Sequence, residues 1–311
     1  MRVALIGGTG FVGSYLVEQL LAKGHQPVLL VRPGSEQRVA ASGVEQVAGE
    51  VEDTAALRQL LTGCDAAIYL VGILRAYPER GITFERLQQE GAERSMELAQ
   101  ELGVERFLLM SANGVRGDGT AYQRTKFAAE EALRKSTLRW TIFRPSVIFG
   151  DPRGRMEFAT QLYRDLVAPP LPAPLFHAGV LPLGAGSMAL SPVYVGDVAA
   201  LFVAALEDAA SVGQCYPVGG PVTLSWKEIL QVIARATGRR MVGVPVPAWG
   251  VKLVAGWLER FEAFPITRDQ VTMLMEGNVC DAGALFARLA ITPTPFAEES
   301  LGYLRSPGPS A

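Results

Sequence analysis

Tyr122 and Lys126 are the pair of residues whose types and spacing best fit acid–base chemistry. They lie four positions apart in the stretch YQRTK, so on a helix they share one face. A phenol with an ordinary pKa of about 10 exchanges protons poorly at neutral pH. A neighbouring ammonium would lower that pKa and could also hold a ribose. The alternative interpretation is an ordinary pair on a helix surface.

A glycine-rich turn, GGTGFVG, follows the apolar run Arg2–Ile6 and precedes a segment with helical spacing of apolar residues. The N-terminus of a helix offers unpaired N–H groups and a positive dipole end, which suit a pyrophosphate. Glycine lets the backbone approach the phosphates and lets helix and strand pack closely. The alternative is a turn needed only for packing. The cofactor contacts predicted here are Gly7, Thr9, Gly10, Phe11, Val12 and Gly13.

Arg32 ends the next apolar run, QPVLLV, about twenty residues after the glycine turn. A carboxylate at this point would accept a hydrogen bond from the adenosine 2′-hydroxyl of NAD. Arginine cannot accept, but it can grip a 2′-phosphate and stack on adenine. The sequence therefore favours NADP(H), with NAD(H) still possible if Arg32 is only a surface residue.

Strand and helix patterns alternate through the first half of the chain, which predicts an α/β fold: a doubly wound parallel sheet, or Rossmann fold. The rhythm breaks after Gly150, where prolines become frequent. We expect residues 1–150 to form an NAD(P)-binding domain, rejoined by about 190–215. Residues 151–311 would form a smaller, discontinuous α/β lobe for a substrate or partner. The expected helices include Thr83–Leu102, Leu224–Thr237, Pro247–Phe261 and Thr267–Met275.

Composition excludes several classes of function. The 311 residues carry a formal charge of −2 and no basic run, so we expect no nucleic-acid partner. The three cysteines and two histidines show no metal-ligand spacing, and His25 is expected in an exposed turn. Residues 168–196 carry no charged side chain but hold six prolines, so we expect no transmembrane segment there. With no signal-peptide pattern, a cytoplasmic location is expected.

Several motifs together resemble the extended branch of the short-chain dehydrogenase/reductase superfamily. They are GGTGFVG, GEVED at 49–53, YQRTK, FRPSVIFGD at 143–151 and SPVYVGDVA at 191–199. The chain is most similar to atypical members, namely the nucleotide-binding accessory subunit of respiratory complex I and bacterial NAD-dependent epimerase/dehydratase-like proteins. ITRDQV at 266–271 and GNVCD at 277–281 resemble the C-terminal signature of that group.

The resemblance implies a role for each matching residue. Tyr122 would be the catalytic acid/base and Lys126 its partner, both also contacting the cofactor. Glu50 and Val51 would lie near adenine, and Val71 and Gly72 beside the riboses. Three further residues, Pro145, Ser146 and Val147, would lie near the nicotinamide carboxamide.

One departure from the superfamily pattern bears on catalysis. Active extended members place a Ser or Thr after the fifth strand to bind the substrate oxygen, and Ala112 takes that position here. Ser111 is one residue away and would point to the other side of the strand; it is a candidate catalytic substitute, as is Asn113 if the loop shifts. The chain is thus either an oxidoreductase or a catalytically weak accessory protein that binds NADP(H) and docks on a larger assembly. A regulator that has lost its cofactor is less favoured.

The second lobe gives weaker signals. An apolar helical face is formed by Trp249, Leu253, Trp257, Leu258 and Phe261, with Phe264 just beyond. We expect this face in the core; the alternatives are a substrate roof, a protein partner or a peripheral membrane contact. The lobe lacks the dense polar cluster expected for a nucleotide sugar, which favours a small-molecule substrate of apolar, quinone-, steroid- or lipid-like type.

Overall fold

The computed structural model describes residues 1–39, 43–258 and 267–305, and the chain divides into two compact units. The first unit comprises Met1–Pro145, Val195–Pro217 and Leu285–Ile291, and the second Ser146–Tyr194, Val218–Ala284 and Thr292–Ala311. The sequence had not indicated that residues 285–291 return to the first unit.

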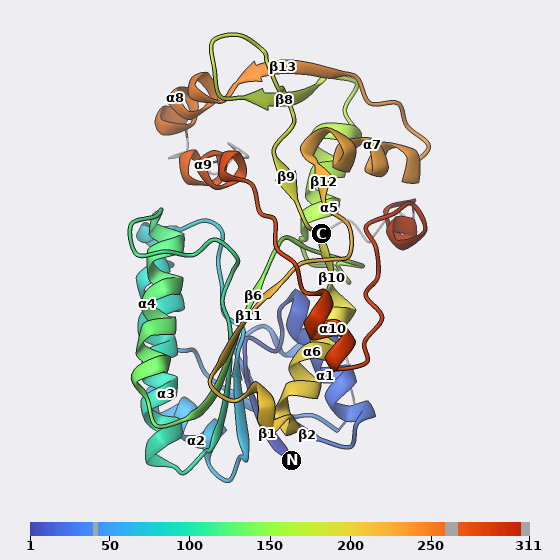
Figure 1. Ribbon diagram of the computed structural model, residues 1–311. Coiled ribbons are helices and arrows are strands. Elements are labelled where there is room, and N and C mark those ends of the chain that lie inside the picture. Colours follow the sequence, from blue (N-terminus) through green and yellow to red (C-terminus); the bar gives the residue numbers. More distant parts are fainter. Residues whose placement is uncertain (40–42, 259–266, 306–311) are drawn as a thin grey trace. The chain divides into compact units, whose positions relative to one another are not determined.

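A seven-stranded sheet forms the centre of the first unit, in the order β11-β6-β5-β4-β1-β2-β3 (Figure 1). The strands are β1 (Arg2–Ile6), β2 (Gln26–Val31), β3 (Glu45–Ala48), β4 (Ala66–Tyr69), β5 (Arg106–Met110), β6 (Arg139–Pro145) and β11 (Gln214–Val218). The registers from β3 across to β6 are all parallel. Four consecutive residues of β1 are fully buried, as expected of a strand covered on both faces. The predicted doubly wound fold is confirmed.

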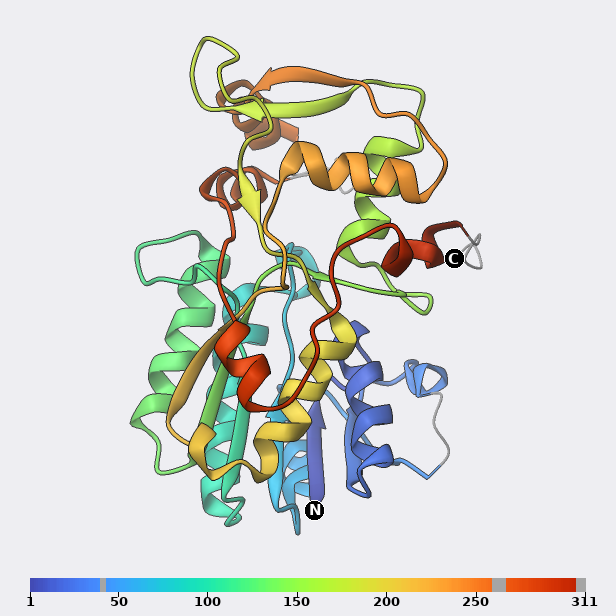
Figure 2. The ribbon, with the colours of Figure 1, turned by 45° about the vertical axis from the view of Figure 1, so that its right-hand side comes forward.

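Helices cover both faces of this sheet, with α2, α3 and α4 on one face and α1 and α6 on the other (Figures 1 and 2). The helices of the first unit are α1 (Phe11–Ala22), α2 (Thr54–Leu61), α3 (Gly91–Glu101), α4 (Ala121–Lys135), α6 (Val195–Glu207) and α10 (Gly283–Arg288). Short 3₁₀ segments lie at η1 (Glu36–Arg38), η2 (Pro78–Arg80) and η5 (Ala209–Ser211).

One expectation for the first unit was refined and one was wrong. The helix predicted over Thr83–Leu102 is present, but its first part is a π-helical segment, η3 (Glu85–Glu90), which continues directly into α3. The hydroxyl of Tyr69, at the end of β4, donates a 2.5 Å hydrogen bond to the carbonyl oxygen of Leu87 within η3. A side chain from the sheet therefore pairs with a backbone carbonyl group of the π-helical segment. His25, expected in an exposed turn, is buried beside the chain's amino group.

The second unit has short strands in pairs and its own apolar core. Its strands are β7 (Ile148–Phe149), β8 (Ala173–His177), β9 (Ala189–Leu190), β10 (Val193–Tyr194), β12 (Leu224–Ser225) and β13 (Gly243–Pro247). Its helices are α5 (Phe158–Leu162), α7 (Trp226–Ala236), α8 (Ala248–Leu258) and α9 (Arg268–Glu276), with a π segment at η4 (Tyr163–Val167) and a 3₁₀ segment at η6 (Glu299–Arg305).

The apolar face of α8 is not the core face that the sequence suggested. Trp249 and Leu253 are exposed, whereas the buried positions are Ala248 and Ala255. The side chains of Trp257 and Leu258, and all of Phe261 and Phe264, fall outside the described residues. No helix among the residues that the structure describes is long and apolar enough to cross a membrane.

Candidate functional site

Most of the predicted site residues gather at the carboxyl edge of the parallel sheet in the first unit. The chain leaves β1 toward β2 on one side, whereas β4 and β5 lie on the other side of β1. Such a reversal of strand order is where open α/β sheets bind their ligands. Gly7, Arg32, Val71 and Ser111 follow the ends of β1, β2, β4 and β5.

The glycine turn is shaped by contacts that admit no side chain. A Cβ built on Gly13 would lie 2.5 Å from the carbonyl oxygen of Gly8, a distance that real Cβ atoms essentially never reach. Gly7 adopts φ +92°, and its Cβ would lie 3.2 Å from the backbone nitrogen of Val71. The turn therefore needs glycine both to bend and to let the ends of β1 and β4 approach.

The N-terminus of α1 offers the features of an anion site. Gly10 is the capping residue and is exposed, and no side chain caps the first N–H groups. The first turn also carries no acidic residue. The uncapped N–H groups and the helix dipole fit a pyrophosphate, so the residues present suit a dinucleotide.

Arg32 and Glu50 lie exposed after β2 and β3, at the place expected for the adenosine end. Among the described residues, nothing forms an ion pair or a side-chain hydrogen bond with the Arg32 guanidinium, so it is available to a phosphate. Val51 is buried, and its carbonyl oxygen accepts a 3.0 Å hydrogen bond from Arg94. The structure thus gives Glu50 and Val51 different environments.

Lys126 is buried at the ends of β4 and β5, with only 2% of its surface exposed. Its Nζ donates hydrogen bonds of 2.9 Å to the carbonyl oxygens of Val71 and Met110. A Cβ on Gly72 would lie 3.3 Å from Nζ, so this glycine makes room for the ammonium. Burial lowers the pKa of Lys126 to about 8, although the nearby Glu130 carboxylate acts in the opposite direction.

Tyr122 lies one turn before Lys126 on α4, and its ring packs edge-on against Phe84 with ring centres 6.0 Å apart. Burial raises the pKa of Tyr122 to about 12. The direction is opposite to the one expected from a neighbouring lysine. The reason is that burial disfavours the phenolate and the Lys126 ammonium is directed to two carbonyl groups.

The residues after β5 that could lie near the substrate oxygen differ in burial. Ser111 is 3% exposed, and its Oγ has no hydrogen-bond partner in the described part of the chain. Ala112 and Asn113 are only partly buried, and the backbone N–H of Asn113 donates to the carbonyl oxygen of Pro145. The contact of Ser111 with a substrate oxygen remains a prediction.

Gln123 is a supporting residue that our sequence analysis missed. It forms a capping box with Thr120 at the start of α4, and its Nε2 donates a 3.0 Å hydrogen bond to the carbonyl oxygen of Gly114. It thereby fastens the loop after β5 to the helix that carries Tyr122. The spacing T-x-x-Q was the signal that could have revealed it.

Ser146 and Val147 belong to the second unit and directly follow Pro145, the last residue of β6. The hydroxyl of Ser146 donates a 2.9 Å hydrogen bond to the carbonyl oxygen of Asn278 in the same unit. Pro145 ends β6 and stays in the first unit. Their contacts with a nicotinamide remain a prediction. No cluster of metal-binding side chains occurs in the described ranges.

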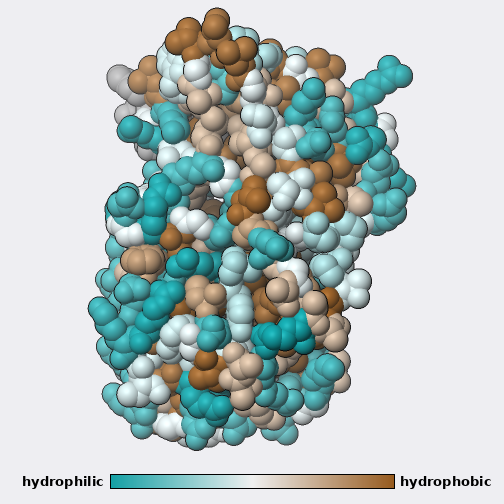
Figure 3. Space-filling view, in the orientation of Figure 1, coloured by the Kyte–Doolittle hydropathy of each residue, from teal (hydrophilic) through white to brown (hydrophobic). Residues whose placement is uncertain are grey.

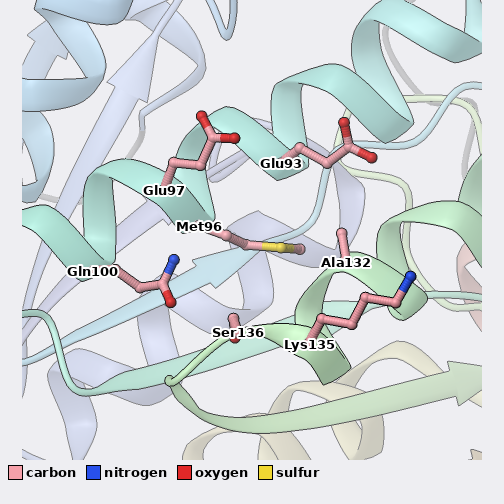
Figure 4. Close-up of a pocket in the computed structure, with 7 residues that line it drawn as sticks. All are labelled: Glu93, Met96, Glu97, Gln100, Ala132, Lys135 and Ser136. Carbon is pink, nitrogen blue, oxygen red and sulfur yellow. The ribbon is translucent and has the colours of Figure 1, made fainter.

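A cavity of about 280 Å³ between α3 and α4 is separate from this site (Figure 4). Met96 points toward Ala132, whereas Glu97 points away from it. Lys135, which also lines it, is thirteen residues after Tyr122 on α4, or about 20 Å along the helix at 1.5 Å per residue. The cavity therefore lies at the other end of α4 from the candidate catalytic pair.

Comparison with known proteins identifies the family of this chain. The sequence profile of the NAD(P)H-binding family matches residues 7–165, just over half of the chain. The chain belongs to the NAD(P)H-binding family. The match begins at the glycine turn and includes Tyr122 and Lys126.

Relatives of this NAD(P)H-binding protein include both a respiratory-chain subunit and a reductase. NADH dehydrogenase (ubiquinone) 1 alpha subcomplex subunit 9 of Arabidopsis thaliana is 29% identical over 92% of this chain and 71% of its own length. Ceramide reductase of Caulobacter vibrioides is 30% identical over 82% of this chain and 76% of its own length. The fold matches UDP-glucose 4-epimerase of Thermus thermophilus with a TM-score of 0.72 over 98% of both chains, at 22% identity. The resemblance to the accessory subunit of complex I is thus confirmed, and the likeness to the epimerase shows a shared fold.

Proposed function

We propose that this protein is an NADP(H)-dependent oxidoreductase that acts on a carbon bearing oxygen. The observation that carries the proposal is Lys126, buried and anchored at the ends of β4 and β5, with Tyr122 one turn away on the same helix. A bound nicotinamide cofactor would supply or accept the hydride. Its pyrophosphate would be held by the turn from Gly7 to Gly13.

Tyr122 would exchange the proton of the substrate oxygen. With its pKa raised to about 12 it is a neutral phenol at pH 7, so it carries the proton that the oxygen of a reduced carbonyl would take up, although burial makes it a weaker acid than a free phenol. A protonated Lys126 has three N–H donors, and two of them are used by Val71 and Met110. The third is available for a ribose hydroxyl, so Lys126 would position the cofactor.

Arg32 supports NADP(H) over NAD(H). It is exposed beyond β2, has no ion-pair partner among the described residues, and can receive a 2′-phosphate. Glu50, exposed after β3, is a candidate for a contact with adenine in the same unit.

An apolar carbonyl compound is the substrate class that we favour. Residues 168–194 of the second unit carry no charged side chain, and the relative from Caulobacter vibrioides is named ceramide reductase. An epimerase or dehydratase cycle would use the same Tyr122 and Lys126. The likeness to the epimerase extends to the fold alone.

A second candidate is a non-catalytic NADP(H)-binding subunit of a larger assembly. It is favoured by Ala112, which stands where active superfamily members carry a hydroxyl, and by the relatives named as NADH dehydrogenase subunits. Affinity capture from native lysate distinguishes this candidate, because a stoichiometric partner is expected for a subunit. The proposed cytoplasmic location can be tested in the same cells by fractionation.

Fluorescence titration with NADPH and NADH tests the cofactor proposal. We expect wild type to prefer NADPH and Arg32→Ala to lose that preference. Arg58→Ala is the control, since Arg58 is exposed on α2 and pairs with Glu101 away from the sheet edge. Equal binding of both cofactors by wild type would reduce Arg32 to a surface residue, and binding of neither would contradict the proposal.

Turnover tests the catalytic proposal separately. With a substrate from a screen of apolar ketones and aldehydes, Tyr122→Phe is expected to lower kcat by about 10²–10⁴-fold while NADPH affinity is kept. Unchanged turnover in Tyr122→Phe would remove Tyr122 from the reaction and leave the binding proposal standing.

A further inference from the structure

A buried carboxylate lies one turn beyond Lys126 on α4. Position 130 continues the spacing of Tyr122 and Lys126 by four residues, so the three side chains lie along one face of the helix. Glu130 is completely buried. In Figure 3 the surface is largely hydrophilic on the side of the first unit where Figure 1 shows α4. A carboxylate that faces inward from such a helix needs partners, because an unpaired buried charge strongly destabilises a fold.

Two arginine side chains hold the Glu130 carboxylate. Arg144 of β6 donates from Nε to Oε1 at 2.8 Å and from Nη2 to Oε2 at 2.6 Å. Arg134, one further turn along α4, places its guanidinium 3.1 Å from the same Oε2. The contact with Arg144 ties α4 to β6, whereas Lys126 ties the same helix to the ends of β4 and β5. Two side chains one turn apart therefore fix α4 to three neighbouring strands.

Glu130 is the charged neighbour that acts on Lys126. β4 and β5 offer the ammonium only backbone carbonyl groups, and Tyr122 is a neutral phenol at neutral pH. The Cys215 thiol of β11 faces Glu130, and its pKa is raised by burial and then by this carboxylate, so it adds no charge at neutral pH. Other charged side chains on the elements around α4 are exposed, paired elsewhere or at the opposite strand ends: Glu85, Glu90 and Glu97 are exposed, Arg86 pairs with Glu52, Glu93 accepts a hydrogen bond from Gln89, Arg94 donates to Val51, and Arg106 and Arg139 begin β5 and β6.

We propose that Glu130, held by Arg144, is a positioning residue that keeps Lys126 an ammonium with a donor left for the cofactor. This role rests on the proposed function, in which the third N–H of Lys126 binds a ribose hydroxyl. A carboxylate one turn away attracts the ammonium through a buried region, where water screens charges weakly. Burial favours the neutral amine instead, which could only accept a hydrogen bond from a third partner.

The pH dependence of NADPH binding in two variants tests this role. Glu130→Gln removes the charge and keeps the shape, so affinity should begin to fall about one pH unit lower than in wild type. Binding should be about fivefold weaker than in wild type at pH 8, and within about twofold of it at pH 6, where acid restores the ammonium. Arg144→Met breaks the same contact but removes a positive charge and leaves Glu130 paired with Arg134. Affinity in that variant should begin to fall at the wild-type pH or above it.

Glu131→Gln is the control for loss of a carboxylate on α4, since Glu131 pairs with Arg134 at 2.9 Å and should leave the pH dependence unchanged. A wild-type pH dependence in Glu130→Gln would overturn the proposal. An equal downward shift in Glu130→Gln and Arg144→Met would also overturn it, because the lost contact and not the lost charge would then be the cause. Circular dichroism shows whether each variant is folded. If Glu130→Gln does not fold, Glu130→Gln/Arg144→Met replaces it, and its affinity should begin to fall at lower pH than in Arg144→Met.

Urea unfolding of the cofactor-free protein separates the role of Glu130 from the proposed function. Relative to a matched Lys126→Met variant, the free energy of unfolding should rise with pH above the pKa of the folded lysine. That rise should begin at about pH 8 in wild type and about one unit lower when Glu130→Gln is present in both proteins. This shift without any NADPH binding would contradict the proposed function alone. An unshifted rise in a protein that binds NADPH would overturn the role of Glu130 alone.

Discussion

The Nζ atom of Lys126 lies 2.9 Å from the carbonyl oxygen of Met110, the last residue of β5. A second bond of the same length to Val71 fixes the amine between two neighbouring strands. A protonated amine keeps one donor beyond these two bonds, whereas a neutral amine has only two N–H groups. Protonation of Lys126 therefore decides whether it can donate a hydrogen bond to a third partner, because the neutral amine could only accept one.

NADPH affinity should depend on this protonation. Because burial lowers the pKa of Lys126 to about 8, we expect affinity to be highest below that pH and to fall as pH rises through it. Fluorescence titrations between pH 6.5 and pH 9.5, about 1.5 units below and above this pKa, measure the change in affinity. Lys126→Met should bind weakly at every pH. A wild-type affinity that stays constant through pH 8 would contradict a Lys126 contact with the cofactor.

The stability of the cofactor-free protein should change in the opposite direction with pH. The pKa of Lys126 is lowered from 10.5 to about 8 by folding, so between these values the unfolded chain binds more protons. Under this linkage the free energy of unfolding rises with pH. Urea unfolding of wild type, compared with Lys126→Met at each pH, isolates the contribution. We expect the wild type to gain relative stability from about pH 8 to pH 10, and a constant difference would indicate an unshifted lysine.

The sheet and the glycine turn could be predicted from sequence because local rules determine both. Apolar runs between turn residues mark buried strands, and glycine spacing marks the turn at Gly13. The environment of Tyr122 could not be predicted, since the rise in its pKa comes from burial by distant segments such as the one that carries Phe84. The exposed face of α8 was mistaken for a core face because periodicity shows that a helix has an apolar side but not what covers it.

Gly13→Ala should disrupt both the fold and the cofactor site. The new methyl group would lie 2.5 Å from the carbonyl oxygen of Gly8, and both atoms belong to the backbone of the turn. We expect a loss of about 1–3 kcal/mol in unfolding free energy, together with at least a tenfold loss of NADPH affinity. Gly256→Ala is the matched control within a helix, because nothing lies within 4 Å of its Cβ. That change should stabilise the protein by up to about 1 kcal/mol. Equal thermal unfolding of the two variants would show that the turn tolerates a side chain.

The roles of positions 111 and 112 after β5 can be tested by removing a hydroxyl group from one and adding it to the other. Ser111→Ala removes a buried hydroxyl that lacks a partner among the described residues, so we expect stability to rise by about 1 kcal/mol and kcat to stay within about twofold. Ala112→Ser places a hydroxyl on the partly buried neighbour, where active superfamily members carry one, and should raise kcat by about tenfold or more. Chemical unfolding and steady-state turnover measure the two effects. A roughly hundredfold loss of kcat in Ser111→Ala without any gain in stability would instead assign the substrate oxygen to Ser111. It would also mean that this loop opens its buried hydroxyl when the substrate binds.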